Sequence, residues 1–392
     1  MALPLRGALS RAGEGGLRRL PSGGLRRLGP GWEAALTSWL VARVAVGLGF
    51  LAAHGAVDAL RPGQPPLALD QGLVAWDGAF YRDIATVGYE RLPEEALRFF
   101  PLFPLLGKLV GAVLPGGATT GLVLVANLSA LVAGWLLHRL VLVEGGSEHR
   151  GTTAVWLVAV LPASSVLVLA YTEALFLALT IGAFLALRRG RWGVVAALAL
   201  LAGLCRPSAA LLALPILLEA LAGLREARWG QRCIRLLAVV AAPLGTALYL
   251  AWVGARFGDP LRPLQIQSTG DLRGRWVNPV TRILDAVGDA PSEGFLGEAL
   301  HVPWIGLFFG LAVLVARRLP ASYTAYTVAV LVLAVSAESL GSFERYGLAA
   351  FPLAIVAADL LRSPVTERPV LLLSTAALAV FTALTLLMVF VP

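Results

Sequence analysis

Long, continuous apolar runs rich in Leu and Ala constrain the fold of this chain more than any other feature. Of its 392 residues, 58% are hydrophobic and 14% are charged, whereas soluble domains carry about 25% charged residues. The runs lack the short alternating pattern of a membrane β-barrel. The sequence therefore predicts an all-α polytopic membrane protein. It excludes a soluble nucleic-acid-binding protein, despite a net charge of +8.

The apolar pattern predicts about 11 transmembrane helices. The expected spans are 38–58, 119–142, 152–170, 173–187, 192–205, 207–223, 234–255, 301–316, 321–337, 346–361 and 370–391. Two assignments depend on further argument. Residues 99–115 are apolar enough to be mistaken for a crossing, and 192–223 could be one long helix or two short ones.

The distribution of arginine decides both assignments, because cytoplasmic loops carry an excess of basic residues. If 99–115 dips without crossing and 192–223 turns back at "CRPS", the short arginine-rich loops all fall inside. These loops are "HRLVLVEGGSEHR", "RRGRW", "LREARWGQR", "RRLP" and "LRSPVTERP". Either alternative moves several of them outside. This topology puts "WDGAFYRD", "YTE", "CRPS" and "ESLGSFERY" together on the outer face.

The topology also divides the chain. Residues 1–32 are rich in Arg and Gly and are expected to form a disordered cytoplasmic arm, with an organelle-targeting peptide as the alternative. Residues 33–392 form one transmembrane domain. Within it, 59–118 is the first outer loop, with a re-entrant or interfacial segment, and 256–300 is the second large outer loop.

Arg206 lies in the turn of the predicted hairpin. Its two legs of about 14 to 17 residues would span roughly 21 to 25 Å, which is less than the roughly 30 Å hydrocarbon core. We therefore expect Arg206 to lie in a cavity below the outer surface. A charge at that depth costs at least about 2.5–3.5 kcal/mol, so such a residue is functional or is paired with an acid in a structural bridge.

The first outer loop contains two unusual stretches. Asp77, between Trp76 and Gly78, either caps a short helix over 79–88 or supplies a general base at the mouth of a cavity. The run "FFPLFPLL" has two prolines that disfavour an ordinary spanning helix. It either starts a helix or forms an aromatic wall beside a lipid groove.

Two further polar features lie at the predicted outer ends of spans. Tyr171, Thr172 and Glu173 form a break that is either a simple turn or part of a site. Glu344 and Arg345 are adjacent and would point in different directions on a helix, so we do not expect them to pair with each other. Arg345 either faces inward toward an anion or anchors the span at the interface.

These stretches together resemble the PIG-V family of mannosyltransferases. The resemblance rests on "WDGAFYRDIATVGYE", "FFPLFPLL", "YTEALFLAL", "RWGVVAALALLAGLCRPSAALL" and "ERYGLAAFPL", in that order from about 70 to 360. It implies a GT-C type glycosyltransferase that takes a sugar, expected to be mannose, from a polyprenyl-phosphate donor on the extracytoplasmic or lumenal face. Asp77 matches the family's key acid in the first outer loop. The acceptor, a lipid or glycan, is not carried over.

The expected reaction is transfer to an acceptor hydroxyl with inversion. Asp77 is the catalytic base, with Asp83 in reserve, because a departing phosphate needs no second carboxyl group to protonate it. Arginine suits the phosphate, and Arg206 and Arg345 are preferred over Arg256, Arg262, Arg273 and Arg275. The full set of expected substrate-binding residues is Trp76, Tyr81, Asp83, Phe100, Phe103, Tyr171, Glu173, Arg206, Glu344 and Arg345.

Other classes stay open. A lipid-linked sugar flippase or transporter would share the apolar composition, although the distinctive stretches occur once each and not as repeats. A non-catalytic assembly subunit is the third possibility. No metal and no cofactor is expected, because the four histidines and two cysteines lack ligand spacing. The membrane would be the bacterial plasma membrane, or the endoplasmic reticulum in a eukaryote.

Overall fold

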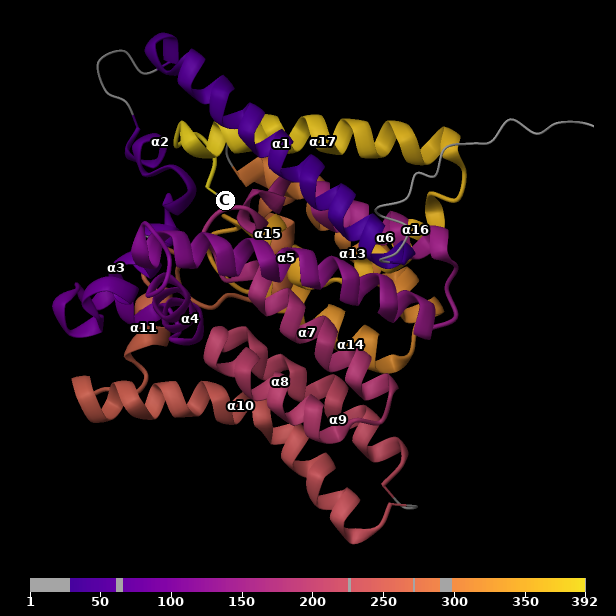
Figure 1. The fold of residues 1–392 in the computed structure, drawn as a ribbon. Coiled ribbons are helices and arrows are strands. Elements are labelled where there is room, and N and C mark those ends of the chain that lie inside the picture. Colours follow the sequence, from indigo (N-terminus) through magenta and orange to yellow (C-terminus); the bar gives the residue numbers. More distant parts are fainter. Residues whose placement is uncertain (1–28, 61–65, 225–226, 271, 290–297, 392) are drawn as a thin grey trace, which may run out of the picture.

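The computed structural model describes residues 29–60, 66–224, 227–270, 272–289 and 298–391. Most of the predicted arm, residues 1–28, therefore lies outside the described part. The described residues fold almost entirely into helices (Figure 1), and their β-structure is one isolated bridge between Trp276 and Ala337. The prediction of an all-α protein is confirmed.

Four helices of the described residues are long and apolar enough to cross a membrane. They are α1 (Pro30–Leu60), α5 (Gly117–Val143), α10 (Trp229–Phe257) and α17 (Pro364–Leu386). The shorter helices α7 (Glu173–Arg188), α8 (Trp192–Cys205), α13 (Val302–Arg318) and α14 (Ala321–Val335) also fall within a few residues of predicted spans. The protein is thus membrane-embedded, and the number of crossings stays a prediction.

Three predicted spans, 152–170, 207–223 and 346–361, are not continuous α-helices. Each is interrupted at or near a proline, whose ring removes a backbone donor and disfavours helix in the preceding residue. The pieces are α6 (Glu148–Val160) with the 3₁₀ helix η5 (Pro162–Leu167), η6 (Pro207–Leu212) with α9 (Ala213–Ala222), and α15 (Phe343–Ala349) with α16 (Pro352–Leu360). The stretches 161–167, 206–212 and 350–351 are therefore not α-helical.

The first outer loop of the predicted topology folds into short helices. In order they are α2 (Leu67–Gln71), η2 (Gly72–Val74), α3 (Asp77–Val87), η3 (Tyr89–Arg91), η4 (Glu94–Arg98) and α4 (Leu102–Gly111). Helix α4 begins within the Phe-Pro run, at its fourth residue, and its ten residues span about 15 Å, half the thickness of the hydrocarbon core. It packs against α5. Figure 1 shows α3, α4 and α11 (Arg262–Gln267) gathered at one end of the bundle, away from α6 and α16.

Helices α8 and α10 cross at a pair of glycines. A Cβ atom at Gly203 would lie 2.2 Å from the carbonyl oxygen of Ala242, and one at Gly245 would lie 2.3 Å from that of Leu200. Only glycine permits this approach of the two backbones. The contact fixes the end of α8, three residues before Arg206.

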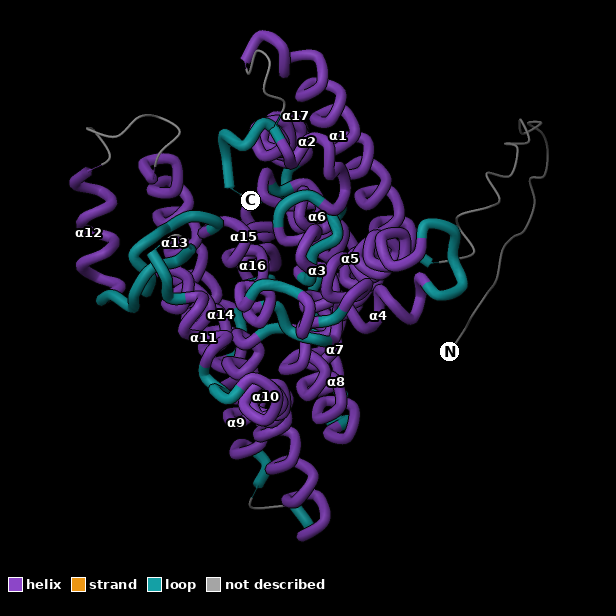
Figure 2. Tube along the Cα trace, turned by 90° about the vertical axis from the view of Figure 1, so that its left-hand side faces the viewer, coloured by secondary structure: helices purple, strands orange, loops and turns teal. Residues whose placement is uncertain are grey.

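The second outer loop returns to the bundle along the end of α14. Backbone amides of Val277, Glu338 and Ser339 donate to carbonyls across this junction, at 3.0 to 3.2 Å. The pairing joins residues 273–277 to residues 336–339. Farther along the loop, α12 (Pro279–Asp289) lies beside α13 at the edge of the bundle (Figure 2). The junction brings Arg273 close to the start of α15.

Candidate functional site

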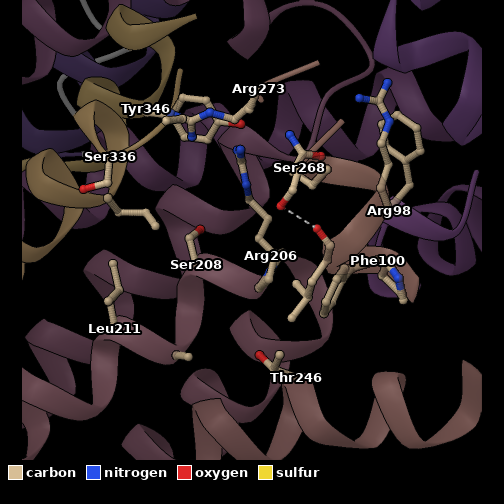
Figure 3. A pocket seen from close by; sticks show the side chains of 18 of the residues that line it. Arg98, Phe100, Arg206, Ser208, Leu211, Thr246, Ser268, Arg273, Ser336 and Tyr346 are labelled. Atoms are coloured by element: carbon tan, nitrogen blue, oxygen red, sulfur yellow. Dashed lines mark hydrogen bonds between the residues drawn. The ribbon is translucent and has the colours of Figure 1, made fainter. Parts of the chain in front are cut away.

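A cavity of about 430 Å³ lies where the first outer loop, η6, α10, α11 and α14 meet. Most of its lining is apolar and includes Phe100, Leu211, Leu264 and Leu333. Figure 3 shows Arg206 reaching into it beneath Tyr346 and Arg273, with Arg98 and Phe100 on another side. A mainly apolar cavity with a few polar groups is the usual form of a small-molecule site.

Asp77 lies at this cavity and is held by two arginines. Its Oδ2 accepts a hydrogen bond of 2.8 Å from Nη1 of Arg345, and its Oδ1 lies 3.6 Å from Nη2 of Arg98. The backbone amide of Asp77 faces the hydroxyl of Tyr171 at 3.4 Å. The carboxylate is a quarter exposed, so it is oriented by the protein and still reaches the cavity.

The backbone directly before Asp77 is strained. Trp76 has φ +57° and ψ −123°, which is a costly conformation for a residue with a side chain. Its indole Nε1 donates to the carbonyl of Thr385 in α17 at 3.0 Å, and this bond secures the turn. The alternative interpretation of Asp77 as a helix cap is wrong. Trp76 is the N-cap and makes no side-chain capping bond, and the Asp77 carboxylate turns to the arginines.

Glu173 joins the two arginines that the sequence favoured. Its Oε1 lies 2.6 Å from Nη1 of Arg206 and 3.5 Å from Nε of Arg345. Glu173 is 6% exposed, and the two arginines are 14% and 11% exposed. Asp77, Arg345, Glu173 and Arg206 therefore form one buried chain of ion pairs, from α3 through α15 and α7 to the start of η6.

Tyr346 stacks with three guanidinium groups beside this chain. The guanidinium of Arg273 lies 4.2 Å from the centre of its ring, and those of Arg345 and Arg206 lie 5.4 and 5.6 Å from it. Cation–π contacts of this kind are favourable when desolvated. The contacts with the electron-rich ring thus offset part of the repulsion among three arginines in one small region.

Several guanidinium N–H groups in this region lack a protein acceptor. The Nε atoms of Arg98 and Arg273 are buried without a hydrogen-bond partner. A buried donor without a partner costs about 1–3 kcal/mol, and more when charged. Oε2 of Glu173 is likewise unpaired. The site therefore has unpaired guanidinium donors at Arg98 and Arg273 as well as one unpaired carboxylate oxygen.

Some predicted site residues lie elsewhere. The cavity lining includes Tyr81 and Phe100 but not Trp76, Asp83, Phe103, Tyr171, Glu173, Glu344 or Arg345. Tyr171, Glu173 and Arg345 stand directly behind the lining and hold Asp77 and Arg206. Phe103 is fully buried and meets the ring of Tyr81 edge-on, so its role is packing.

Two predicted acids have partners away from the cavity. Asp83 forms a surface pair with Arg82 at 2.8 Å. Glu344 is 1% exposed. Its Oε1 and Oε2 lie 2.8 and 2.9 Å from Nδ1 of His301. As predicted, Glu344 and its neighbour Arg345 pair with different residues. Neither Asp83 nor Glu344 is positioned to contact a molecule in the cavity.

The arginines of the second outer loop differ from one another. Arg256 pairs with Glu90, Arg262 with Glu94 and Arg275 with Glu338, all at exposed positions. The Arg256 guanidinium lowers the pKa of Glu90 by its hydrogen bond and its charge. Arg273 differs, because it donates to the carbonyl of Ala334 at 2.6 Å and lines the cavity.

Arg98 and Tyr346 line the cavity but were not predicted from the sequence as site residues. Arg98 is the last charged residue before the Phe-Pro run, and its guanidinium lies 4.5 Å from the centre of the Phe99 ring. A charge directly before an apolar aromatic run was the available signal. Tyr346 follows the "ER" of the last predicted outer stretch. Its contacts with the arginines in the structure, and no feature of the sequence, identify it as a site residue.

No group of three or more His, Cys, Asp or Glu side chains among the described residues could hold a metal ion. Asp77 and Glu173, the acids of the site, are each engaged by arginine. This donor set is arranged for an anion, since guanidinium groups bind carboxylates and phosphates through paired hydrogen bonds.

Fold and site together define a helical membrane protein with an arginine-lined, otherwise apolar cavity. Residues 67–224 match the family model of the PIG-V mannosyltransferases. The predicted resemblance is confirmed. The matched stretch includes Asp77, Arg98, Glu173 and Arg206, whereas Arg273 and Arg345 come from beyond it. No curated protein matches the chain.

Proposed function

We propose that the protein transfers mannose from a polyprenyl-phosphate donor to an acceptor hydroxyl, with inversion, on the extracytoplasmic or lumenal face of its membrane. The observation that carries this proposal is the set of buried arginine N–H groups without acceptors at one end of an apolar cavity. A lipid phosphate would match both the arginine N–H groups and the apolar lining of the cavity. Its oxygens accept from the guanidinium groups, and its hydrocarbon chain covers the apolar lining.

Asp77 is the proposed base. The acceptor oxygen bonds to the anomeric carbon, the bond from that carbon to the phosphate oxygen breaks, and the electron pair leaves with the lipid phosphate. The hydroxyl proton passes to Asp77. Positioned bases of this kind contribute about 10²–10⁴-fold to rate, and no acid is needed for a leaving phosphate.

The two arginines on Asp77 have different parts in this mechanism. Arg98 makes the longer contact, at 3.6 Å, and its Nε has no partner. We propose that Arg98 turns to the donor phosphate when substrate binds, while Arg345 keeps Asp77 oriented. The arriving substrate would thus release the carboxylate of Asp77 from one of its two cations.

Arg206 and Arg273 are the proposed ligands of the phosphate as its charge grows. Both line the cavity and stack on Tyr346. Fixed cations at a site of developing charge stabilise the transition state, because they need no reorganisation during the reaction. Glu173 holds Arg206 in place from behind.

The proposed sidedness rests on the arginine-rich loops. A cytoplasmic side at "RRGRW" and "RRLP" agrees with the excess of basic residues in cytoplasmic loops. Asp77 and the cavity then lie on the opposite side. The division into a cytoplasmic arm, a transmembrane domain and two large outer loops is part of the same proposal.

The test is transfer of labelled mannose by purified protein in lipid. Polyprenyl-phosphate mannose is the donor, and an extract of host lipids and glycans supplies acceptors. Transfer by the wild type and not by Asp77→Asn supports both the class and the base. Equal transfer by both removes Asp77 from the chemistry. If neither transfers, the proposed transfer from this donor to these acceptors fails, and a flipping assay with the same donor tests the transporter alternative.

A further inference from the structure

The cavity carries more positive than negative charge. Four guanidinium groups and two carboxylates line it or stand directly behind its lining, an excess of two positive charges. These groups are Arg98, Arg206, Arg273, Arg345, Asp77 and Glu173. The nearby charges of Arg275 and Glu338 offset each other in a surface pair, and Glu344 faces His301.

Solvent does little to screen this excess of positive charge, because the charged groups are largely buried. Arg98, Arg206 and Arg345 have side chains 11% to 15% exposed. Burying an uncompensated charge is costly, and buried pairs are poorly screened by salt. The cavity therefore selects a ligand by its negative charge as well as by its shape.

The charge of the ligand changes during the proposed reaction. The donor is a phosphodiester with one negative charge. The leaving lipid phosphate is a monoester, and such groups carry about −1.5 to −2 at neutral pH. The proton taken from the acceptor rests on Asp77, so the excess around the ligand rises from two to three at the same moment. Both changes favour the leaving group over the donor.

We infer that the cavity is built for a lipid phosphate monoester and binds it more tightly than the phosphodiester with the same chain. The identity of this ligand as the leaving group rests on the proposed function. Its preferential binding rests on the charges alone. The consequence for an enzyme is retention of, and inhibition by, the lipid phosphate product.

The experiment compares dodecyl phosphate with methyl dodecyl phosphate by calorimetry on purified protein in an uncharged detergent. The two probes share the chain and differ by one methyl group and one charge. We expect the monoester to bind about tenfold more tightly or better, the ratio that corresponds to 1.4 kcal/mol. Inorganic phosphate is the third probe. It should bind more weakly than dodecyl phosphate if the chain occupies the apolar part.

Equal affinity for the two esters would overturn the inference. So would inorganic phosphate binding as tightly as dodecyl phosphate, since the ligand would then be free phosphate and not a lipid.

Two variants locate the binding. Arg98→Gln removes a cavity arginine. It is expected to weaken the binding of dodecyl phosphate about tenfold and the binding of the diester by less. Arg256→Gln is the matched control, because Arg256 is on the same side of the protein in a surface pair with Glu90. It should leave the ratio unchanged. If Arg98→Gln unfolds, Arg273→Gln takes its place. An unchanged ratio in the folded variant places the monoester elsewhere and refutes the inference.

Failure of this inference differs from failure of the proposed function. The calorimetry contains no sugar donor and no acceptor, so a protein that transfers nothing can still prefer the monoester. Conversely, mannose transfer by a protein that binds both esters equally would leave the function intact and reject only the preference. In the transfer assay, dodecyl phosphate should inhibit at lower concentration than its methyl ester.

Discussion

Arg345 donates a hydrogen bond of 2.8 Å to Asp77, although the two residues are 268 positions apart in the sequence. The pair joins α3 of the first outer loop to α15, near the other end of the chain. It also couples position to charge, because the group that orients the carboxylate is a cation. Any account of the activity has to treat the two residues as one unit.

Asp77→Asn should reduce mannose transfer by about 10²–10⁴-fold, the usual contribution of a positioned base. The amide is isosteric and can still meet Arg345, but it cannot accept the proton of the acceptor. Arg345 keeps Glu173 as a second partner at 3.5 Å, so the variant should fold. The measurement is initial rate with labelled donor.

Asp83→Asn is the control for that variant. Asp83 lies on the same helix and forms a surface pair with Arg82, so its loss should leave the rate unchanged. If Asp83→Asn reduced the rate as much as Asp77→Asn, the assignment of Asp77 as the base would be wrong. Asp83 would then become the candidate, as the reserve base predicted from the sequence.

Glu173→Gln should destabilise the protein by about 3–5 kcal/mol, the range observed when one partner of a buried ion pair is removed. Its carboxylate is 6% exposed and neutralises Arg206 and part of Arg345. The measurement is the free energy of unfolding in detergent. Glu94→Gln, which removes the partner of Arg262 at an exposed position, should produce no measurable change. Equal stability of the two variants would mean that Glu173 is solvated.

The long helices could be predicted from the sequence because hydropathy is a local property. Residues 119–142, 173–187 and 192–205 were expected as spans and fall in α5, α7 and α8. The broken segments were harder. A window of apolar residues does not reveal that Pro162 or Pro352 interrupts the helix, because prolines also occur within spanning helices.

The site was only partly predictable, for a different reason. Arg206 drew attention because charge at membrane depth is rare, Asp77 because it lies between Trp76 and Gly78 in the first outer loop, and Arg345 because it lies at the start of a span. Which of them meet is decided by helix packing, which the sequence does not report. Glu344 carries the same signal as Arg345 beside it, yet it turns to His301. Arg98 was hidden among the many charges of its own loop.

His301 and Glu344 should prove energetically coupled. The pair is buried, with Nδ1 of His301 at 2.8 Å from Oε1 of Glu344. His301→Ala and Glu344→Ala should each destabilise, and the double variant should cost less than their sum, with a coupling energy of about 0.5–3 kcal/mol. The measurement is a double-mutant cycle on unfolding. Additive effects would show that the two residues are not energetically coupled. Glu344 would then again be a candidate ligand of the substrate.

Gly203→Ala should destabilise the protein by about 1–3 kcal/mol, the usual cost of forcing extra volume into a packed contact. The added Cβ would lie 2.2 Å from the carbonyl oxygen of Ala242, and backbone cannot yield as a flexible side chain does. Helices α8 and α10 would have to separate, which would shift Arg206 at the end of α8. We therefore expect transfer to fall along with stability.

Gly193→Ala on the same helix is the matched control. A Cβ at Gly193 meets nothing within 4 Å, and alanine is favoured over glycine in helices by up to about 1 kcal/mol. This variant should be as stable as the wild type or slightly more so, with full transfer. If Gly203→Ala is equally stable and active, the crossing of α8 and α10 tolerates a wider separation, and the position of Arg206 does not depend on their close contact.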